Sequence, residues 1–279
     1  MENLVEIHQA TRPELSQIAS FIASASVIHR HLDWRNTLEW LGSSPFLILS
    51  DSKEIQAILV AAPDPPGFAW IRCFAVGKNI SPDSAWSLLS ANAEITLSAE
   101  NARMAAVGLQ EWFSRLLVRH GFAIKQKIVV LEWNHHFIVP IESQQQIYTR
   151  PMENSDIPEV SEVDRLAFEP LWVNSQTSLQ AAFLQSSHAT VAVLNSKIIA
   201  YELSTSAQFN AHLAHLAVLP EFRRQAIGRV LVNEMLTYYA QKGIFQVTVN
   251  TQNDNLASLH LYKSVGFRPT FEEYPVLFK

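Results

Sequence analysis

Short apolar runs alternate with longer segments of helical periodicity along the chain. In the second half, apolar residues three and four positions apart predict a half-buried helix at residues 227–241, and a second helix follows at residues 256–265, capped by Gly266. Strands are predicted at residues 191–194, 199–203, 212–218 and 246–250. This alternation predicts a mixed sheet with helices packed against it.

The same pattern occurs twice in the chain. An Arg-Pro turn, two apolar strands, a strand ending in Ala-Val and a helix ending in Gly-Phe recur in one order, at offsets of about 140 residues. The matched segments are Arg12-Pro13 with Arg150-Pro151, residues 46–49 and 57–60 with 189–194 and 198–203, residues 74–76 with 216–218, and Gly121-Phe122 with Gly266-Phe267. We therefore expect two tandem domains, residues 1–141 and residues 146–279, separated by a polar linker at residues 142–146.

Composition and charge narrow the class of protein. Of the 279 residues, 48% are hydrophobic and 17% are charged, which supplies enough apolar material for two buried cores. The net charge of −5 disfavours a nucleic-acid surface, which needs a basic face. Cys73 is the single cysteine, so no internal disulfide forms, and no signal peptide or membrane span is evident. We expect a soluble cytoplasmic protein, a monomer or a homodimer, without nucleic-acid or membrane partners.

The junction between the strand at residues 212–218 and the following helix carries the candidate chemistry. It reads Arg223-Arg224-Gln225-Ala226-Ile227-Gly228, followed by Arg229. Small residues at the start of a helix leave backbone N–H groups pointing outward, and the helix dipole strengthens their attraction for anions. With three arginines beside these amides, the junction predicts a site for a diphosphate.

These residues resemble the GNAT superfamily of acyl-CoA-dependent N-acyltransferases. The first family motif is a basic residue or Gln, two variable residues, Gly, one variable residue, and Gly or Ala, after a strand ending in Leu-Ala-Val and a Pro turn. Arg223 to Gly228 match it except at Ala226, which replaces the first glycine; we expect the alanine to be tolerated provided that its φ is negative. The second motif is matched by Asn255, Ser258, Leu261, Tyr262 and Gly266-Phe267.

The resemblance covers roughly residues 147–269 and implies an α/β fold class: two tandem GNAT-like domains, each a mixed central sheet flanked by helices. It implies acetyl-CoA as the co-substrate, no metal, direct transfer to an amine, and Tyr262 as the general acid for the departing thiolate. Its implied cofactor-binding residues are Leu216, Ala217, Val218, Arg223, Arg224, Gln225, Ala226, Ile227, Gly228, Arg229, Asn255 and Ser258.

A base must take a proton from the amine before attack, and His212 is our candidate. It stands on the strand where some branches of the family place a catalytic Glu or His, and histidine titrates in the useful range. The alternative is a half-buried strand residue without a catalytic role. His215, at an odd offset, should face the other side of the sheet. Glu202 and Glu273 are reserve candidates.

Three further features have structural and functional interpretations. Phe168, Trp172 and Phe183 either line the acceptor site or pack the core. The pair His135-His136 is not expected to bind a metal, because strand neighbours point to opposite faces. The first half has Leu117 where the second has Tyr262, and no small-residue loop follows its strand at residues 74–76, so we expect a degenerate copy that supports the active half.

The sequence thus predicts an N-acetyltransferase that moves the acetyl group of acetyl-CoA to a primary amine of a small molecule or peptide. The alternative is a non-catalytic acyl-CoA-binding sensor or interaction module. A larger acyl group, or an acceptor other than nitrogen, also remains open.

Overall fold

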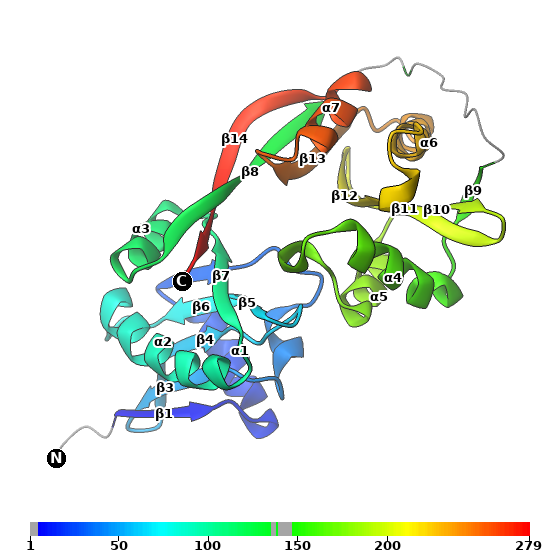
Figure 1. Ribbon diagram of the computed structural model, residues 1–279. Coiled ribbons are helices and arrows are strands. Elements are labelled where there is room, and N and C mark those ends of the chain that lie inside the picture. The colour runs from blue at the N-terminus through cyan, green and yellow to red at the C-terminus, as the bar shows by residue number, and fades with distance from the viewer. Residues whose placement is uncertain (1–4, 135–137, 139–146) are drawn as a thin grey trace. The chain divides into compact units, whose positions relative to one another are not determined.

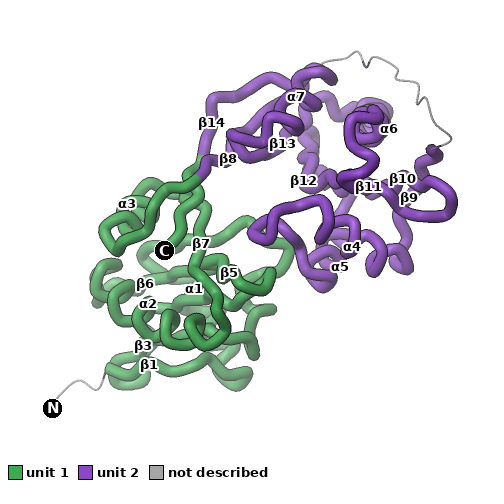
Figure 2. Tube along the Cα trace, viewed as in Figure 1, with its two compact units in different colours: residues 1–125, 274–279 green, residues 126–273 purple. Residues whose placement is uncertain are grey.

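The computed structural model describes residues 5–134, 138 and 147–279 (Figure 1). The chain divides into two compact units, which Figure 2 distinguishes: unit 1 is Met1–Lys125 with Tyr274–Lys279, and unit 2 is Gln126–Glu273. The predicted linker at residues 142–146 and the pair His135-His136 lie outside the described residues. No helix in the described part of the chain is long and apolar enough to cross a membrane.

Unit 1 has a five-stranded sheet of order β1-β3-β4-β6-β2. Its elements are β1 (Val5–Gln9), α1 (Leu15–Ser24), β2 (Val27–Arg30), β3 (Phe46–Asp51), β4 (Glu54–Val60), β5 (Phe68–Trp70), β6 (Cys73–Val76), α2 (Pro82–Ala99), β7 (Arg103–Val107) and α3 (Glu111–Arg119). Alternate residues of β3 enter two cores: Leu47 and Leu49 lie in the cluster that contains Trp86 of α2, whereas Phe46 and Ile48 lie in the cluster that contains Ile18 of α1. The period-two pattern of the strand therefore buries both faces of the sheet.

Unit 2 has strands in the order β14-β8-β13-β12-β11-β10-β9. Its elements are β8 (Ala123–Trp133), β9 (Tyr148–Pro151), α4 (Ile157–Ala167), α5 (Gln176–Gln185), β10 (His188–Leu194), β11 (Lys197–Ala207), β12 (Asn210–Val218), α6 (Ile227–Gln241), β13 (Gln246–Gln252), α7 (Leu256–Ser264) and β14 (Arg268–Phe278). The apolar stripe of α6, including Val232, Met235 and Leu236, packs in one core with Leu131 and Trp133 of β8. The predicted mixed α/β architecture is confirmed.

Two strands belong to units that the sequence repeat would not assign to them. β8 follows the first half of the sequence, yet it pairs with β13 from Val247 opposite Trp133 to Gln252 opposite Ile128. β14 is the last strand of the chain, yet its final residues pair with β7, with Val276 opposite Val107. Each unit therefore includes strand residues from the other half of the sequence.

Candidate active site

The loop between β12 and α6 has the backbone geometry of an anion cradle. After a short 3₁₀ turn at Pro220–Phe222, Arg224 and Ala226 both adopt left-handed conformations, with φ of 61° and 63°. Alternation of left-handed residues turns successive N–H groups toward one point, which makes a concave anion site. The first helical bond of α6 runs from the Val230 N–H to the Ala226 carbonyl at 3.0 Å, so the preceding amides are available to a ligand. The condition under which Ala226 was expected to be tolerated, a negative φ, is not met, because this residue is one of the two left-handed positions that form the cradle.

The three arginines of the loop have different environments. Arg223 Nε donates to the Val218 carbonyl at 3.2 Å and its Nη2 donates to the Ala167 carbonyl at 2.6 Å, so this side chain ties the loop to β12 and to the end of α4. Arg224 is exposed beside the cradle. The Nε of Arg229 is buried without a partner among the described residues. Arg224 and Arg229 are therefore better placed than Arg223 to meet a diphosphate.

Gly228 is required by packing rather than by its backbone conformation. A Cβ on Gly228 would lie 3.2 Å from Leu261 Cδ2 of α7 and 3.8 Å from Val218 Cγ2 of β12. The glycine therefore brings the start of α6 close to α7 and to the end of β12, beneath the loop.

The two strands beside the loop separate before they reach it. β12 pairs in parallel with β13 only from Asn210 to Leu213. Beyond that point β12 pairs with β11 alone, and a cleft of about 1220 Å³ opens. The cleft is lined by Leu216, Ala217, Val218, Arg223, Arg224, Ala226, Ile227, Gly228, Arg229, Asn255 and Ser258, together with Phe168, Glu169 and Trp172. Every sequence-predicted cofactor residue except Gln225 thus lies on one surface.

Asn255 has a structural task in addition to its place in the cleft. Its Oδ1 accepts the Ser258 N–H at 3.1 Å and so caps the start of α7, while its Nδ2 donates to Gln252 Oε1 at 3.3 Å. The cap fixes the orientation of α7 against the cleft. Ser258, on the first turn of α7, stands at the same wall.

His212 and His215 face the same side of the sheet, so the expectation that His215 faces the other side is wrong. His212 lies opposite Thr205 of β11 and His215 lies opposite Leu203, with the register shifted by one residue between Leu203 and Ser204. Thr205 and Leu203 are two residues apart and share a face, and opposed residues in a pair of strands project together. Ala214 is the extra residue of this β-bulge, and it reverses the alternation along β12.

A fully buried carboxylate holds His215 on this face. Asp164 of α4 has no exposed surface, and its Oδ2 lies 2.7 Å from His215 Nε2. The same oxygen accepts from the Tyr201 hydroxyl, and Oδ1 accepts the Asn174 N–H at 2.7 Å. His215 also packs on Phe168, with ring centroids 4.6 Å apart, and Phe168 lines the cleft. No local pattern in the sequence indicates this pair, because Asp164 and His215 are brought together only by packing of α4 on the sheet.

Like His215, the other candidate acid and base residues are not among the residues that line the cleft. His212 Nδ1 contacts Thr248 Oγ1 at 2.8 Å, and burial lowers the pKa of this histidine. Tyr262 is 5% exposed in the core beneath α6, where burial raises the pKa of its hydroxyl. Glu202 is buried against His188, and Glu273 pairs with Lys127 at the surface. Phe183 is not among the residues that line the cleft, whereas Phe168 and Trp172 are.

The corresponding edge in unit 1 is closed by a strand. β6 matches the end of β12 in the repeat, and β4 pairs with it on one side as β11 pairs with β12. On its other side β2 pairs along the whole of β6, from Val76 opposite Val27 to Cys73 opposite Arg30. At the start of α2, the Ser81 hydroxyl accepts the Ser84 N–H at 3.1 Å, and Asp83 in the first turn is held by Arg119. Backbone groups and helix start are therefore already occupied in unit 1.

Comparison with known proteins gives one family and one fold. Residues 152–267 match the model of the Acetyltransferase (GNAT) family. The chain is similar to the [Ribosomal protein bS18]-alanine N-acetyltransferase of Escherichia coli (strain K12), with 29% identity over 73 residues, 26% of this chain and 49% of that protein. It is also similar to N-acetyltransferase 8B of Homo sapiens, with 36% identity over 62 residues, 22% of this chain and 27% of that protein. The chain thus spans about half the length of the first of these curated relatives and less of the second.

A solved structure extends the likeness to the whole chain. The tandem GNAT protein from the clavulanic acid biosynthesis pathway aligns over 99% of this chain and 98% of its own, with a TM-score of 0.64 and 13% identity. At that identity the likeness shows the fold, and it confirms the predicted fold class of two tandem GNAT-like domains.

Proposed function

Because this chain belongs to the GNAT acetyltransferase family through residues 152–267, we propose that it transfers the acetyl group of acetyl-CoA directly to a primary amine of a small molecule or peptide. One observation carries the proposal: the anion cradle and the point where β12 separates from β13 lie in the same cleft of unit 2. A long co-substrate with a diphosphate at one end and a thioester at the other requires both features.

The residues of the cleft fit acetyl-CoA. Left-handed Arg224 and Ala226 turn backbone N–H groups toward the place where a diphosphate would lie, with the guanidinium groups of Arg224 and Arg229 beside it. The backbone of Leu216 to Val218, free of β13, is the natural partner for the amides of the pantetheine arm. An N–H of this segment near Val218 would stabilise negative charge on the carbonyl oxygen under attack.

We assign the base to His215 rather than to His212. Contact of its Nε2 with the carboxylate of Asp164 fixes the ring, favours the tautomer in which Nδ1 accepts a proton, and stabilises the imidazolium that forms. Phe168 connects His215 with the cleft. His212 lacks a carboxylate contact among the described residues, and burial lowers its pKa, which makes it a weaker base than an ordinary histidine.

Tyr262 remains the proposed general acid. Burial raises its pKa, so the phenol keeps its proton throughout the neutral range. Its neighbours Leu261 and Ser258 line the cleft. Its own side chain packs in the core, so we propose that its hydroxyl reaches the sulfur only at the inner end of the cleft.

The acceptor end of the cleft supports an amine. Phe168 and Trp172 form an apolar surface there, and Glu169 between them in sequence supplies an exposed carboxylate. A protonated amine is attracted by a carboxylate and by aromatic faces. Before transfer it must give up a proton, which the nearby His215 accepts.

The first half supports unit 2 without a cofactor of its own. β2 occupies the edge of β6 that would receive a pantetheine arm, and Leu117 stands in place of Tyr262.

The test is release of free CoA thiol from acetyl-CoA in the presence of amines, polyamines, amino acids, aminoglycosides and peptides with free N-termini. We expect turnover with at least one class, and its loss in Gly228→Glu, whose carboxylate would repel a diphosphate and collide with Leu261. Acetyl-CoA binding without turnover on any acceptor would instead support the non-catalytic sensor. Unchanged acetyl-CoA binding by Gly228→Glu would refute the cofactor site.

A further inference from the structure

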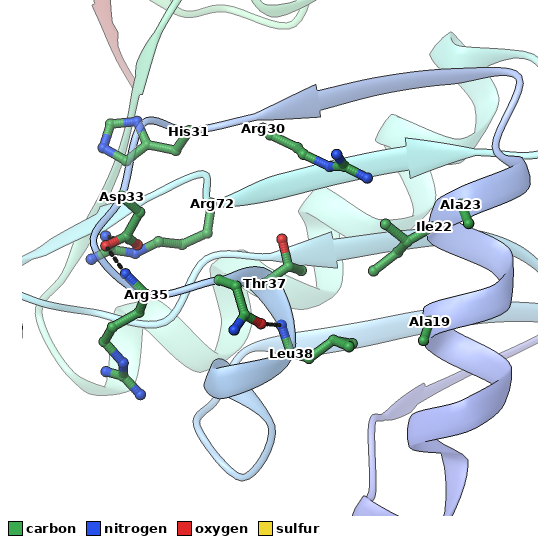
Figure 3. A pocket seen from close by; sticks show the side chains of 11 residues that line it. Ala19, Ile22, Ala23, Arg30, His31, Asp33, Arg35, Thr37, Leu38 and Arg72 are labelled. Carbon is green, nitrogen blue, oxygen red and sulfur yellow. Dashed lines mark hydrogen bonds and ion pairs between the residues drawn. The ribbon is translucent and has the colours of Figure 1, made fainter. Parts of the chain in front are cut away.

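Unit 1 contains a pocket of its own, of about 320 Å³, between α1, the end of β2 and the segment that follows β2 (Figure 3). It is formed entirely by unit 1 residues, so it is independent of the cleft in unit 2.

Charged and apolar side chains lie at different ends of the pocket. Figure 3 shows His31, Asp33 and Arg72 gathered at one end, and Ala19, Ile22 and Ala23 of α1 at the other. Arg30 extends from β2 toward α1 above the space between them. A ligand that fits both ends has a polar head and an apolar tail.

The charge of the pocket is positive, although the chain as a whole is acidic. Arg30, Arg35 and Arg72 line it, and Asp33 is the one acidic residue among its lining residues. Asp33 is already used: its Oδ2 accepts from Arg72 Nη1 at 2.6 Å, and its Oδ1 accepts the Arg35 N–H at 3.2 Å. Two guanidinium charges are left without a carboxylate from the lining residues.

Polar groups without partners lie at the charged end and, in the case of Arg30, above the middle of the pocket. Arg72 is 7% exposed, and its Nε is buried without a hydrogen-bond partner in the described part of the chain. His31 Nδ1 is also buried without a hydrogen-bond partner in the described part of the chain. The His31 ring stacks on Trp70, with centroids 4.9 Å apart. Arg30 is exposed, and no described residue forms a hydrogen bond or ion pair with its guanidinium. Buried polar atoms without partners are rare in folded proteins, so these atoms are free to meet a ligand.

The cations at this end are held in place without a ligand. Two guanidinium groups lie over the ring of Trp40, which is 2% exposed, with Arg35 Cζ at 3.7 Å and Arg72 Cζ at 4.1 Å from the ring centroid. Arg35 Nη2 donates to the Glu39 carbonyl at 2.9 Å. A ligand meeting these groups therefore loses little entropy in ordering them.

We propose that this pocket binds a small organic acid, with its carboxylate toward Arg72, His31 and Arg30 and its short apolar chain against Ala19, Ile22 and Ala23. A carboxylate matches the planar guanidinium groups, and it would accept from the donors that are now unused. The proposal does not depend on the transferase activity of unit 2. It gives the first half a binding role in place of the cofactor site that β2 closes.

Titration calorimetry of the full chain with sodium hexanoate, in buffer free of other carboxylates, tests the proposal. We expect saturable binding with one site per chain, and none with hexylammonium or 1-hexanol, which share the tail but lack the carboxylate. Inorganic phosphate is the second probe, because it has the charge without the tail. Phosphate binding as tight as that of hexanoate would overturn the organic-acid assignment.

Three variants locate the site. Arg30→Gln changes an exposed side chain, and we expect hexanoate affinity to fall about tenfold or more. Ala23→Phe, at an exposed position of α1, should fill the apolar end and lower affinity with every arginine in place. Arg115→Gln removes an equal charge from α3, outside the pocket, and should bind as the parent does. Equal affinity of the parent, Arg30→Gln and Ala23→Phe would overturn the proposal, as would loss of hexanoate binding in Gly228→Glu, which would place the site in unit 2.

Discussion

His215 and Asp164 form a contact of 2.7 Å between an imidazole nitrogen and a carboxylate with no exposed surface. The pair joins β12 to α4 at the face where Phe168 reaches the cleft. The structure therefore distinguishes two histidines, of which the sequence favoured His212. Both face the same side of the sheet, and only His215 carries a carboxylate partner among the described residues.

Replacing His215 by Gln should lower kcat/KM about 10²- to 10⁴-fold, because removal of a positioned base costs an amount of this order. Binding of acetyl-CoA, measured by calorimetry, should stay within about twofold, since His215 does not line the cofactor loop. His212→Gln is the matched control, and its kcat/KM should change far less. A larger loss in His212→Gln than in His215→Gln would return the base to His212.

Tyr262→Phe tests the general acid without a change of volume. We expect kcat to fall while acetyl-CoA affinity is retained, because the phenyl ring still fills the core with Phe267, whose ring centroid lies 5.7 Å away. Leu117 of unit 1 occupies the position equivalent to Tyr262, because its carbonyl accepts the Phe122 N–H at 3.0 Å as the Tyr262 carbonyl accepts the Phe267 N–H at 3.0 Å. Unit 1 therefore folds with an apolar residue at this position. Unchanged kcat with full cofactor binding would remove the acid role.

Ala226→Gly should stabilise the protein by up to about 1 kcal/mol, because an alanine with φ of 63° is strained and a glycine is not. Urea unfolding at fixed pH measures the change. Gly243→Ala is the reverse control: its φ is 75° and no heavy atom lies within 4 Å of an added Cβ, so only backbone strain enters, and stability should fall by about 1 kcal/mol. Destabilisation by Ala226→Gly would contradict the left-handed assignment of the cradle.

A fragment of residues 126–273 should fold, whereas residues 146–273 should not. The shorter fragment lacks β8, which pairs with β13 over six residue pairs and places Leu131 and Trp133 in the core beneath α6. Loss of two large buried side chains costs roughly 5–10 kcal/mol, comparable to the whole stability of a domain. Circular dichroism and proteolysis of the two fragments provide the measurement. A cooperative unfolding transition in residues 146–273 would show that β8 is dispensable.

Local patterns in the sequence predicted the elements well, and contacts between distant residues account for what they missed. The helix at Ile227–Gln241 has the expected bounds, because its periodicity is a local signal. The orientation of His215 depends on one extra residue in β12, which only its pairing with β11 reveals. The pairing of β2 with the edge of β6 and the pairing of β8 with β13 of unit 2 likewise join distant segments. A hydrophobic pattern indicates a strand but does not specify which strand it pairs with.

Acidification should destabilise unit 1 through His29. This residue has no exposed surface, its ring stacks on Phe113 with centroids 3.9 Å apart, and burial lowers its pKa to about 4 from the usual 6.5. Below pH 6.5 the unfolded chain binds a proton at this position and the folded chain does not, so stability is lost as the pH falls from 6.5 toward 4. A lowering of the pKa from 6.5 to about 4 corresponds to about 3 kcal/mol of stability. Urea unfolding at pH 7.5 and pH 4.5 should show a smaller loss of stability for His29→Gln than for the parent protein.

Phe113→Leu is the control: it removes the stacked ring but leaves the titrating group, so it should lower stability at pH 7.5 and keep the acid sensitivity of the parent. An equal loss on acidification in His29→Gln and the parent would assign that loss to other groups.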